Sequence, residues 1–123
     1  MRKYETKESV IEKKVCTYAE SKGCQVKKFR SINAKGMPDK IFIMPTGVVF
    51  FIEFKRRNNY SFAKLQKQVC TELEAMGANI FVVKDFESGK ALIDKCFEAI
   101  KIFKNLRIRD LVEVGEECLI ENY

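Results

Sequence analysis

Three residues near the middle of the chain have the types and spacing that phosphate-ester chemistry requires. Asp39 follows Pro38, and Glu53 and Lys55 end the apolar run 48–55. Carboxylate oxygens are ligands that Mg²⁺ prefers, and a lysine beside them can orient a water or offset charge developing on a phosphate. The alternative is structural: an Asp in a turn and an exposed strand end also produce so short a pattern.

A predicted β-hairpin brings these residues together. Two runs of β-branched and aromatic residues, 40–44 and 48–55, flank Pro45-Thr46-Gly47. If the turn is this three-residue loop, Asp39 falls directly opposite Glu53, with Lys55 on the same face because side chains alternate along a strand. Like charges placed opposite each other are destabilising, so a cation between them is expected. A two-residue turn would shift the register and separate the acids.

The composition narrows the chemistry further. The chain has no His, and its five cysteines show no CxxC spacing. Histidine-based catalysis is therefore excluded, and a disulfide framework or a zinc site is disfavoured. An enzyme of this composition must work with carboxylates, lysines and a metal bound through oxygen.

The net charge of +6 is unevenly distributed along the chain. Residues 1–67 carry 16 Lys and Arg against 6 Asp and Glu, whereas residues 68–123 carry 7 against 11. A basic half favours a polyanionic partner such as nucleic acid. The alternative is a lysine-rich solvated surface without a partner.

The elements that must position these residues follow from hydrophobic periodicity and turn signals. The predicted order is α-β-β-β-α-β-α, a mixed β-sheet flanked by helices in the α/β class. The expected helices are residues 5–22, a helix capped by Ser61 and ended by Gly77, and residues 87–103. The expected strands are residues 24–30, 40–44 and 48–55 and a short buried strand at 79–84.

The chain is expected to form a single domain, residues 1–123, with a core at about 5–103 and an acidic extension, 104–123, that the pattern does not assign. Its N-terminus is charged and lacks the apolar stretch of a signal peptide, and no apolar run reaches membrane-span length. We expect a cytoplasmic protein (the host cytoplasm if it is of phage origin) that does not contact membranes.

Several motifs together closely resemble the VRR-NUC family of nucleases in the PD-(D/E)xK superfamily. They are Gly36-Met37-Pro38-Asp39, Phe51-Ile52-Glu53-Phe54-Lys55, and Ser61 to Gln66 ahead of a helix, within a resemblance covering roughly residues 5–95. The resemblance implies a restriction-endonuclease-like core and phosphodiester cleavage with Mg²⁺ or Mn²⁺, without a small-molecule cofactor. Small phage-type members are similar to Holliday-junction resolvases and act as homodimers.

The resemblance also assigns roles to individual residues. Asp39, Glu53 and the backbone carbonyl of Phe54 match the metal ligands, and Lys55 matches the catalytic lysine. Two further matches complete the predicted site: the first-helix glutamate is Glu12, with Glu8 as a competing candidate, and the glutamine of the following helix is Gln66.

Candidate DNA contacts surround this motif. Arg56 and Arg57 continue directly from Lys55, and Lys67 belongs to the same basic stretch, because residues 54–71 contain no acid. Ser31 and Lys35 precede Pro38 in a polar loop and could contact phosphate. Gly36 in that loop is expected to let a phosphate-bearing ligand approach the backbone closely.

The leading hypothesis is a metal-dependent, structure-selective DNA endonuclease that resolves four-way junctions as a homodimer. A flap or end-processing nuclease is the first alternative. A non-catalytic nucleic-acid-binding module of the same fold is the second, and it leaves the clustered carboxylates unexplained. A sequence-specific restriction-type enzyme is disfavoured because the short chain leaves little room for a recognition element.

Overall fold

The computed structural model describes residues 7–28, 36–55, 64–102, 111, 113 and 115–118. Its elements in chain order are α1 (Glu8–Ser21), β1 (Gln25–Lys28), β2 (Lys40–Ile43), β3 (Val49–Phe54), α2 (Lys64–Ala75), β4 (Asn79–Val83), α3 (Phe86–Ile100) and the short 3₁₀ helix η1 (Glu116–Cys118). The predicted order is confirmed, and η1 is an additional element in the extension. Ser61, the expected cap of α2, lies outside the described residues. None of the helices that the structure describes has the length and apolar character needed to cross a membrane.

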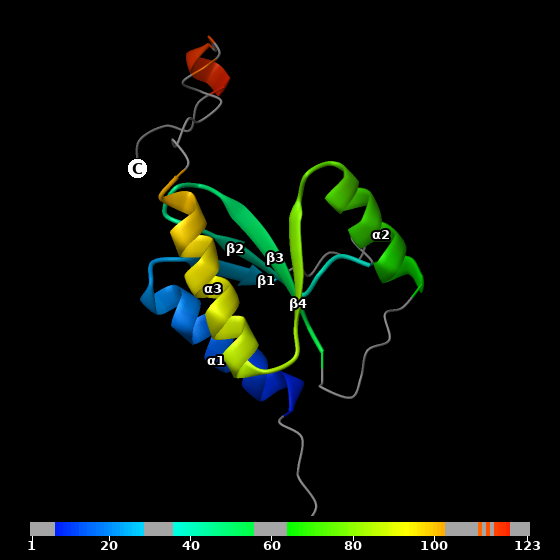
Figure 1. Ribbon diagram of the computed structural model, residues 1–123. Coiled ribbons are helices and arrows are strands. Elements are labelled where there is room, and N and C mark those ends of the chain that lie inside the picture. Colours follow the sequence, from blue (N-terminus) through cyan, green and yellow to red (C-terminus); the bar gives the residue numbers. More distant parts are fainter. Residues whose placement is uncertain are drawn as a thin grey trace, which may run out of the picture.

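The four strands form one mixed sheet in the order β1-β2-β3-β4. β1, β2 and β3 are antiparallel neighbours, whereas β4 runs parallel to β3. A parallel neighbour requires a crossover connection, and α2 supplies it. Figure 1 shows α1 and α3 together on one face of the sheet and α2 on the other. The expected mixed sheet flanked by helices is therefore confirmed.

The core lies between the sheet and the pair formed by α1 and α3. Phe50, Ile52 and Phe54 alternate along β3 onto this face, and each is at most 1% exposed. Phe42 of β2 pairs with Phe50 across the strands, and their rings stack with centroids 4.9 Å apart. Full burial of such side chains stabilises the folded state by about 1.5–3 kcal/mol each, so this face supplies most of the hydrophobic stabilisation.

The opposite face is covered less completely, which corrects one expectation. The strand at 79–84 was expected to be buried, but β4 is an edge strand in which Val82 is 41% exposed and only Val83 is buried. Apolar side chains in and just after α2 are also exposed, with Leu65 at 46% and Met76, which follows the last residue of the helix, at 86%. The physical reason is that α2 packs mainly on β4 alone, so one helix must cover a face that two helices cover on the other side.

A single glycine sets how closely α3 approaches its neighbours. A Cβ added at Gly89 would lie 2.5 Å from a methyl group of Val15 on α1 and 3.0 Å from one of Val83 on β4. The two helices are also linked at their surface, where the Tyr18 hydroxyl donates a hydrogen bond to the Asp94 carboxylate. The close packing of α3 on both neighbours therefore depends on the missing side chain at Gly89.

We predict that Gly89→Ala destabilises the protein. Alanine is a better helix former than glycine by about 1 kcal/mol, but the clash with Val15 should cost about 1–3 kcal/mol and dominate. Urea denaturation measures the change, and a gain in stability would contradict the packing described here. In a Val15→Ala background, which removes the nearest methyl groups, the same substitution should cost less than it does in the wild type.

Candidate active site

The hairpin turn determines which residues face each other across β2 and β3. The Met44 N–H donates to the Val48 carbonyl at 2.9 Å, so the connection is the expected three-residue loop. Lys40 then pairs with Ile52 as the last residues of the ladder, and one further step places Asp39 opposite Glu53. The predicted register is confirmed.

Two crossed hydrogen bonds hold these acids at the open end of the hairpin. The backbone N–H of Asp39 donates to Glu53 Oε1 at 3.0 Å, and the backbone N–H of Phe54 donates to Asp39 Oδ2 at 3.1 Å. Each carboxylate is therefore fixed by the backbone of the other strand. This arrangement keeps the two acids side by side although their charges repel each other.

Two further side chains contact Glu53. Lys55 Nζ lies 3.2 Å from Glu53 Oε2, and both side chains are largely buried, at 14% and 5% exposed. The backbone of Lys55 is fixed as well, since its N–H donates to the Val83 carbonyl and extends the ladder to β4. Gln66, in the first turn of α2, also hydrogen-bonds the Glu53 carboxylate. The structure thus brings together four of the predicted site residues.

Glu53 is the one charged residue that is buried among those that the structure describes, at 4% exposed. Burial raises its pKa, and the neighbouring Asp39 carboxylate raises it further, against the opposing effects of hydrogen bonds from Gln66 and Lys55. The ionised carboxylate is therefore unfavourable in the folded protein without more positive charge nearby.

The donor set suits a hard divalent cation. Mg²⁺ is typically bound by one or two carboxylates and retains several waters, and two carboxylates with unequal surroundings meet here. In the described part of the chain, no group of three His, Cys, Asp or Glu side chains could surround a metal. Any ion at this place would rely on Asp39, Glu53, backbone oxygen and water.

Glu12 does not lie beside Asp39 and Glu53. Its Oε1 is 3.4 Å from Lys40 Nζ, and each side chain is about one quarter exposed, at 27% for Glu12 and 21% for Lys40. Lys40 pairs with Ile52, so it belongs to the face of the sheet covered by α1, opposite the face of Asp39 and Glu53. A metal-binding role of Glu12, or of Glu8 one turn earlier, stays a prediction.

Gly36 has a different neighbour from the one expected. It has φ +87°, and a Cβ there would lie 2.9 Å from a methyl group of Val69 and 3.0 Å from the Leu65 carbonyl oxygen. The close backbone approach that glycine permits is therefore made to α2, whereas the expected approach of a phosphate-bearing ligand stays a prediction. The contact seats α2 beside the loop that leads to Asp39.

Cys70 is a neighbour of the site that sequence reasoning missed. It is 8% exposed, and burial followed by the charge of Glu53 raises the pKa of its thiol. The sequence spacing could have indicated this neighbour, because Cys70 lies four residues after Gln66 and therefore on the same side of α2. A thiol with a raised pKa is a weak nucleophile, and here it packs as an apolar residue.

Most of the predicted DNA contacts lie outside the described residues, namely Ser31, Lys35, Arg56 and Arg57. The remaining one, Lys67, is exposed on α2, one residue after Gln66. A cation at this position is therefore accessible to a substrate near the site.

The chain is similar to a solved structure described as a VRR_NUC domain. The two share 32% sequence identity with a TM-score of 0.64, over 76% of this chain and 96% of that chain. No family model matches the sequence, and no curated protein is significantly similar to it.

The electrostatics of the site predict that Glu53→Gln stabilises the protein in the presence of a chelator. Glutamine keeps an oxygen for the Asp39 N–H but removes the buried charge, and we expect a gain of about 1 kcal/mol, or a few degrees in Tm. Because the folded-state pKa of Glu53 lies above its unfolded value, ionisation costs stability as pH rises beyond about 4.3.

Thermal melts across a pH series check this expectation. The advantage of the glutamine variant should be largest near neutral pH and shrink as the pH falls below the usual carboxyl range. Glu98→Gln, at a side chain that is 74% exposed, is the matched control and should leave Tm unchanged. A destabilised Glu53→Gln variant at neutral pH would contradict the assignment of a buried, strained charge.

Proposed function

This chain belongs to the VRR-NUC family of nuclease domains, and from that premise we propose that it is a metal-dependent DNA endonuclease that hydrolyses phosphodiester bonds. The observation that carries the proposal is the pair of crossed hydrogen bonds that hold Asp39 and Glu53 against each other. A protein that only binds nucleic acid gains nothing from two opposed carboxylates, one of them buried, because their negative charge repels phosphate.

The residues that would hold a Mg²⁺ or Mn²⁺ ion are Asp39, Glu53 and the backbone carbonyl of Phe54. Glu12 would join them only by leaving its ion pair with Lys40. The raised pKa of Glu53 supports this assignment, because a bound cation would favour its ionised form. When bound, the ion supplies Lewis acidity toward the scissile phosphate and toward the attacking water.

Lys55 is the residue proposed to act on the reacting phosphate. Its ammonium group is held beside Glu53 by a 3.2 Å contact, within a largely buried setting where its charge is weakly screened. From there it would stabilise the negative charge that develops on the phosphate, or orient the water that attacks it. Gln66 would position the Glu53 carboxylate through its hydrogen bond.

The proposed substrate is branched DNA, and in particular a four-way junction. Symmetric cutting of such a junction needs two active sites related by a twofold axis, so the proposal includes a homodimer. The basic first half of the chain supports a nucleic-acid partner, because a basic surface attracts phosphate. A flap or end-processing nuclease requires only a monomer and is the alternative that substrate tests distinguish.

We predict that Asp39→Asn and Lys55→Met each lower the cleavage rate by at least about a hundredfold. Cleavage is measured with Mg²⁺ or Mn²⁺, and with chelator, on four-way junction, flap, duplex and single-stranded DNA. Lys101→Met is the matched control for removal of a lysine, since Lys101 is 70% exposed and directly follows α3, which covers the face of the sheet opposite Asp39 and Glu53; it should retain the wild-type rate.

The outcomes separate the hypotheses. Wild-type cleavage by either the Asp39 or the Lys55 variant would overturn the site. Binding of DNA without cleavage of any substrate would favour a non-catalytic module. Preference for flaps over junctions would replace the junction-resolving proposal with the flap nuclease.

A second prediction concerns binding rather than chemistry. Substitution of Arg56 and Arg57 by alanine should weaken DNA binding and lower the slope of log affinity against log salt concentration by roughly one for each phosphate that the variant no longer neutralises. Fluorescence anisotropy over a salt series measures the slope. Lys101→Ala should leave it unchanged, and an unchanged slope in the double arginine variant would exclude both arginines from the DNA interface.

A further inference from the structure

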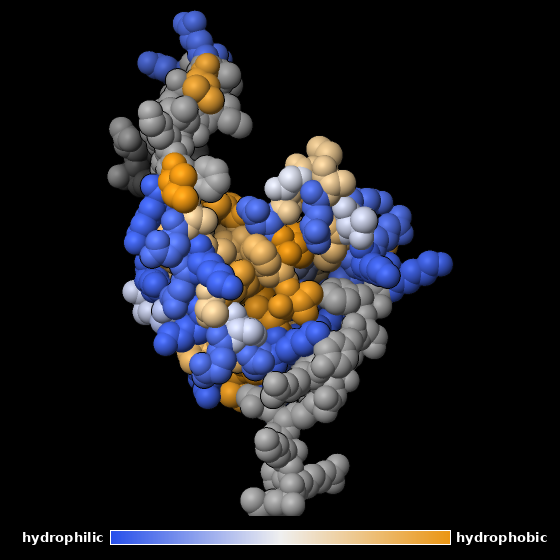
Figure 2. All heavy atoms as spheres, in the orientation of Figure 1, coloured by the Kyte–Doolittle hydropathy of each residue, from blue (hydrophilic) through white to orange (hydrophobic). Residues whose placement is uncertain are grey.

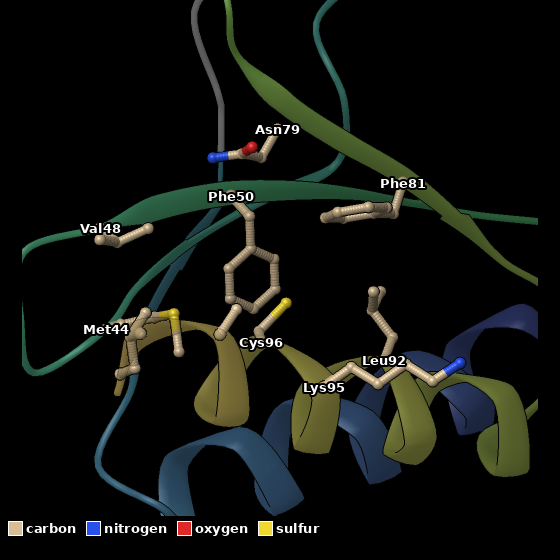
Figure 3. A pocket seen from close by; sticks show the side chains of 10 residues that line it. Met44, Val48, Phe50, Asn79, Phe81, Leu92, Lys95 and Cys96 are labelled. Atoms are coloured by element: carbon tan, nitrogen blue, oxygen red, sulfur yellow. The ribbon is translucent and has the colours of Figure 1, made fainter. Parts of the chain in front are cut away.

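An apolar groove of 540 Å³ lies on the side of the sheet away from Glu53, between the strands and the second half of α3. Its walls include Phe50 and Phe81 from β3 and β4, and Leu92, Cys96 and Ile100 from α3. Figure 3 shows the side chains of Phe50 and Cys96 pointing toward each other across it. Figure 2 shows apolar side chains gathered in this hollow.

The groove exists because α3 packs chiefly on α1 and only lightly on β4. Phe81 is consequently half-buried, although it makes an edge-to-face contact with the core residue Phe50 at 6.2 Å between centroids. Among the described residues that line the groove, Lys95 and Asn79 are polar, and Lys95 is the one cation. A matching occupant is therefore apolar and carries negative charge.

The chain itself contains a segment of this kind. Residues 110–123 hold five acids and no Lys or Arg, whereas residues 1–109 hold all 23 basic residues against 12 acids. The apolar residues of this C-terminal segment are interleaved with the acids: Leu111, Val112, Val114, Leu119 and Ile120. Its composition is complementary to the apolar groove and to Lys95.

The described part of this segment lies outside the groove of its own chain. Figure 1 shows η1 standing beyond the end of α3, away from the sheet and the other helices. Two large apolar side chains between α3 and η1 in the sequence are strongly exposed, Ile102 at 85% and Leu111 at 66%. The groove and the segment are thus two complementary surfaces at the same end of α3.

We propose that the C-terminal segment, residues 110–123, of one copy occupies the groove of a second copy, and that the exchange is reciprocal. The groove ends at Ile100, which is also the last residue of α3, so the chain that leads to the segment starts beside the groove. If the twofold axis of the dimer passes near this point, the segment of each copy lies at the groove of the other copy. The nine residues between Ile100 and the segment, 101–109, can span up to about 30 Å when extended. The proposal rests on the homodimer of the proposed function but not on its chemistry.

Two native cysteines provide the test. Cys96 lines the groove and Cys118 is the last residue of η1, whereas Cys16, Cys24 and Cys70 are buried. Mild oxidation of the full-length protein with diamide should yield a disulfide-linked dimer on a non-reducing gel, with a Cys96–Cys118 peptide in the mass spectrum. The reaction is run at alkaline pH, because burial raises the pKa of the Cys96 thiol.

Single variants identify the link. Cys96→Ser and Cys118→Ser should each abolish the covalent dimer, and the matched control Cys70→Ser should retain it. A Cys96–Cys118 link within one chain would overturn the exchange between copies. A dimer that survives Cys96→Ser would show that the segment contacts another surface.

A non-covalent measurement accompanies the cross-link. Leu119→Asp with Ile120→Asp should raise the dissociation constant of the dimer at least about a hundredfold in sedimentation experiments, because charges would enter the apolar groove. Val10→Asp, at a 41% exposed position on α1, is the matched control and should leave it unchanged. A strictly monomeric wild type would refute both the homodimer and this interface, whereas a dimer insensitive to the double variant would refute the interface alone.

Discussion

The structure depends on one constraint at the open end of the β2–β3 hairpin, where two carboxylates must stay together against their mutual repulsion. Backbone N–H groups of Asp39 and Phe54 meet this constraint by donating to the carboxylate of the opposite strand. The cost is visible in the raised pKa of Glu53, which burial produces first and the charge of Asp39 increases. Unfavourable electrostatics of this kind are relieved by positive charge near the two carboxylates.

The two faces of the sheet differ in what they carry: one holds the core and the other holds the candidate site. The face under α1 and α3 holds the buried aromatic core, and it keeps the strands rigid. The face under α2 carries Glu53 and its partners, and α2 covers it only in part. Rigid strands beneath a partly open face are what a nuclease requires, because the catalytic groups must be fixed while a large substrate approaches. The apolar groove beside α3 lies on the core side, so a partner bound there would not obstruct the site.

Most of the architecture followed from local patterns. Alternation of apolar residues predicted the strands, and Pro45-Thr46-Gly47 predicted the loop that sets the register of Asp39 against Glu53. The buried state expected for β4 was wrong, because burial depends on which strand occupies the sheet edge and how far α2 extends over it. The close approach at Gly36 was expected from its residue type, but its partner, α2, lies far along the chain.

The sequence by itself determined the hairpin and, for a three-residue turn, the shared face of the acids and Lys55, because side-chain alternation acts over a few residues. The structure decided that the turn has three residues. Only the tertiary structure decided which groups surround the acids and Lys55. The docking of α2 lets Gln66 hydrogen-bond Glu53 and brings Cys70 within the influence of its charge, and the packing of α1 pairs Glu12 with Lys40. These contacts join segments that are distant in the chain, and the packing of whole elements selects them.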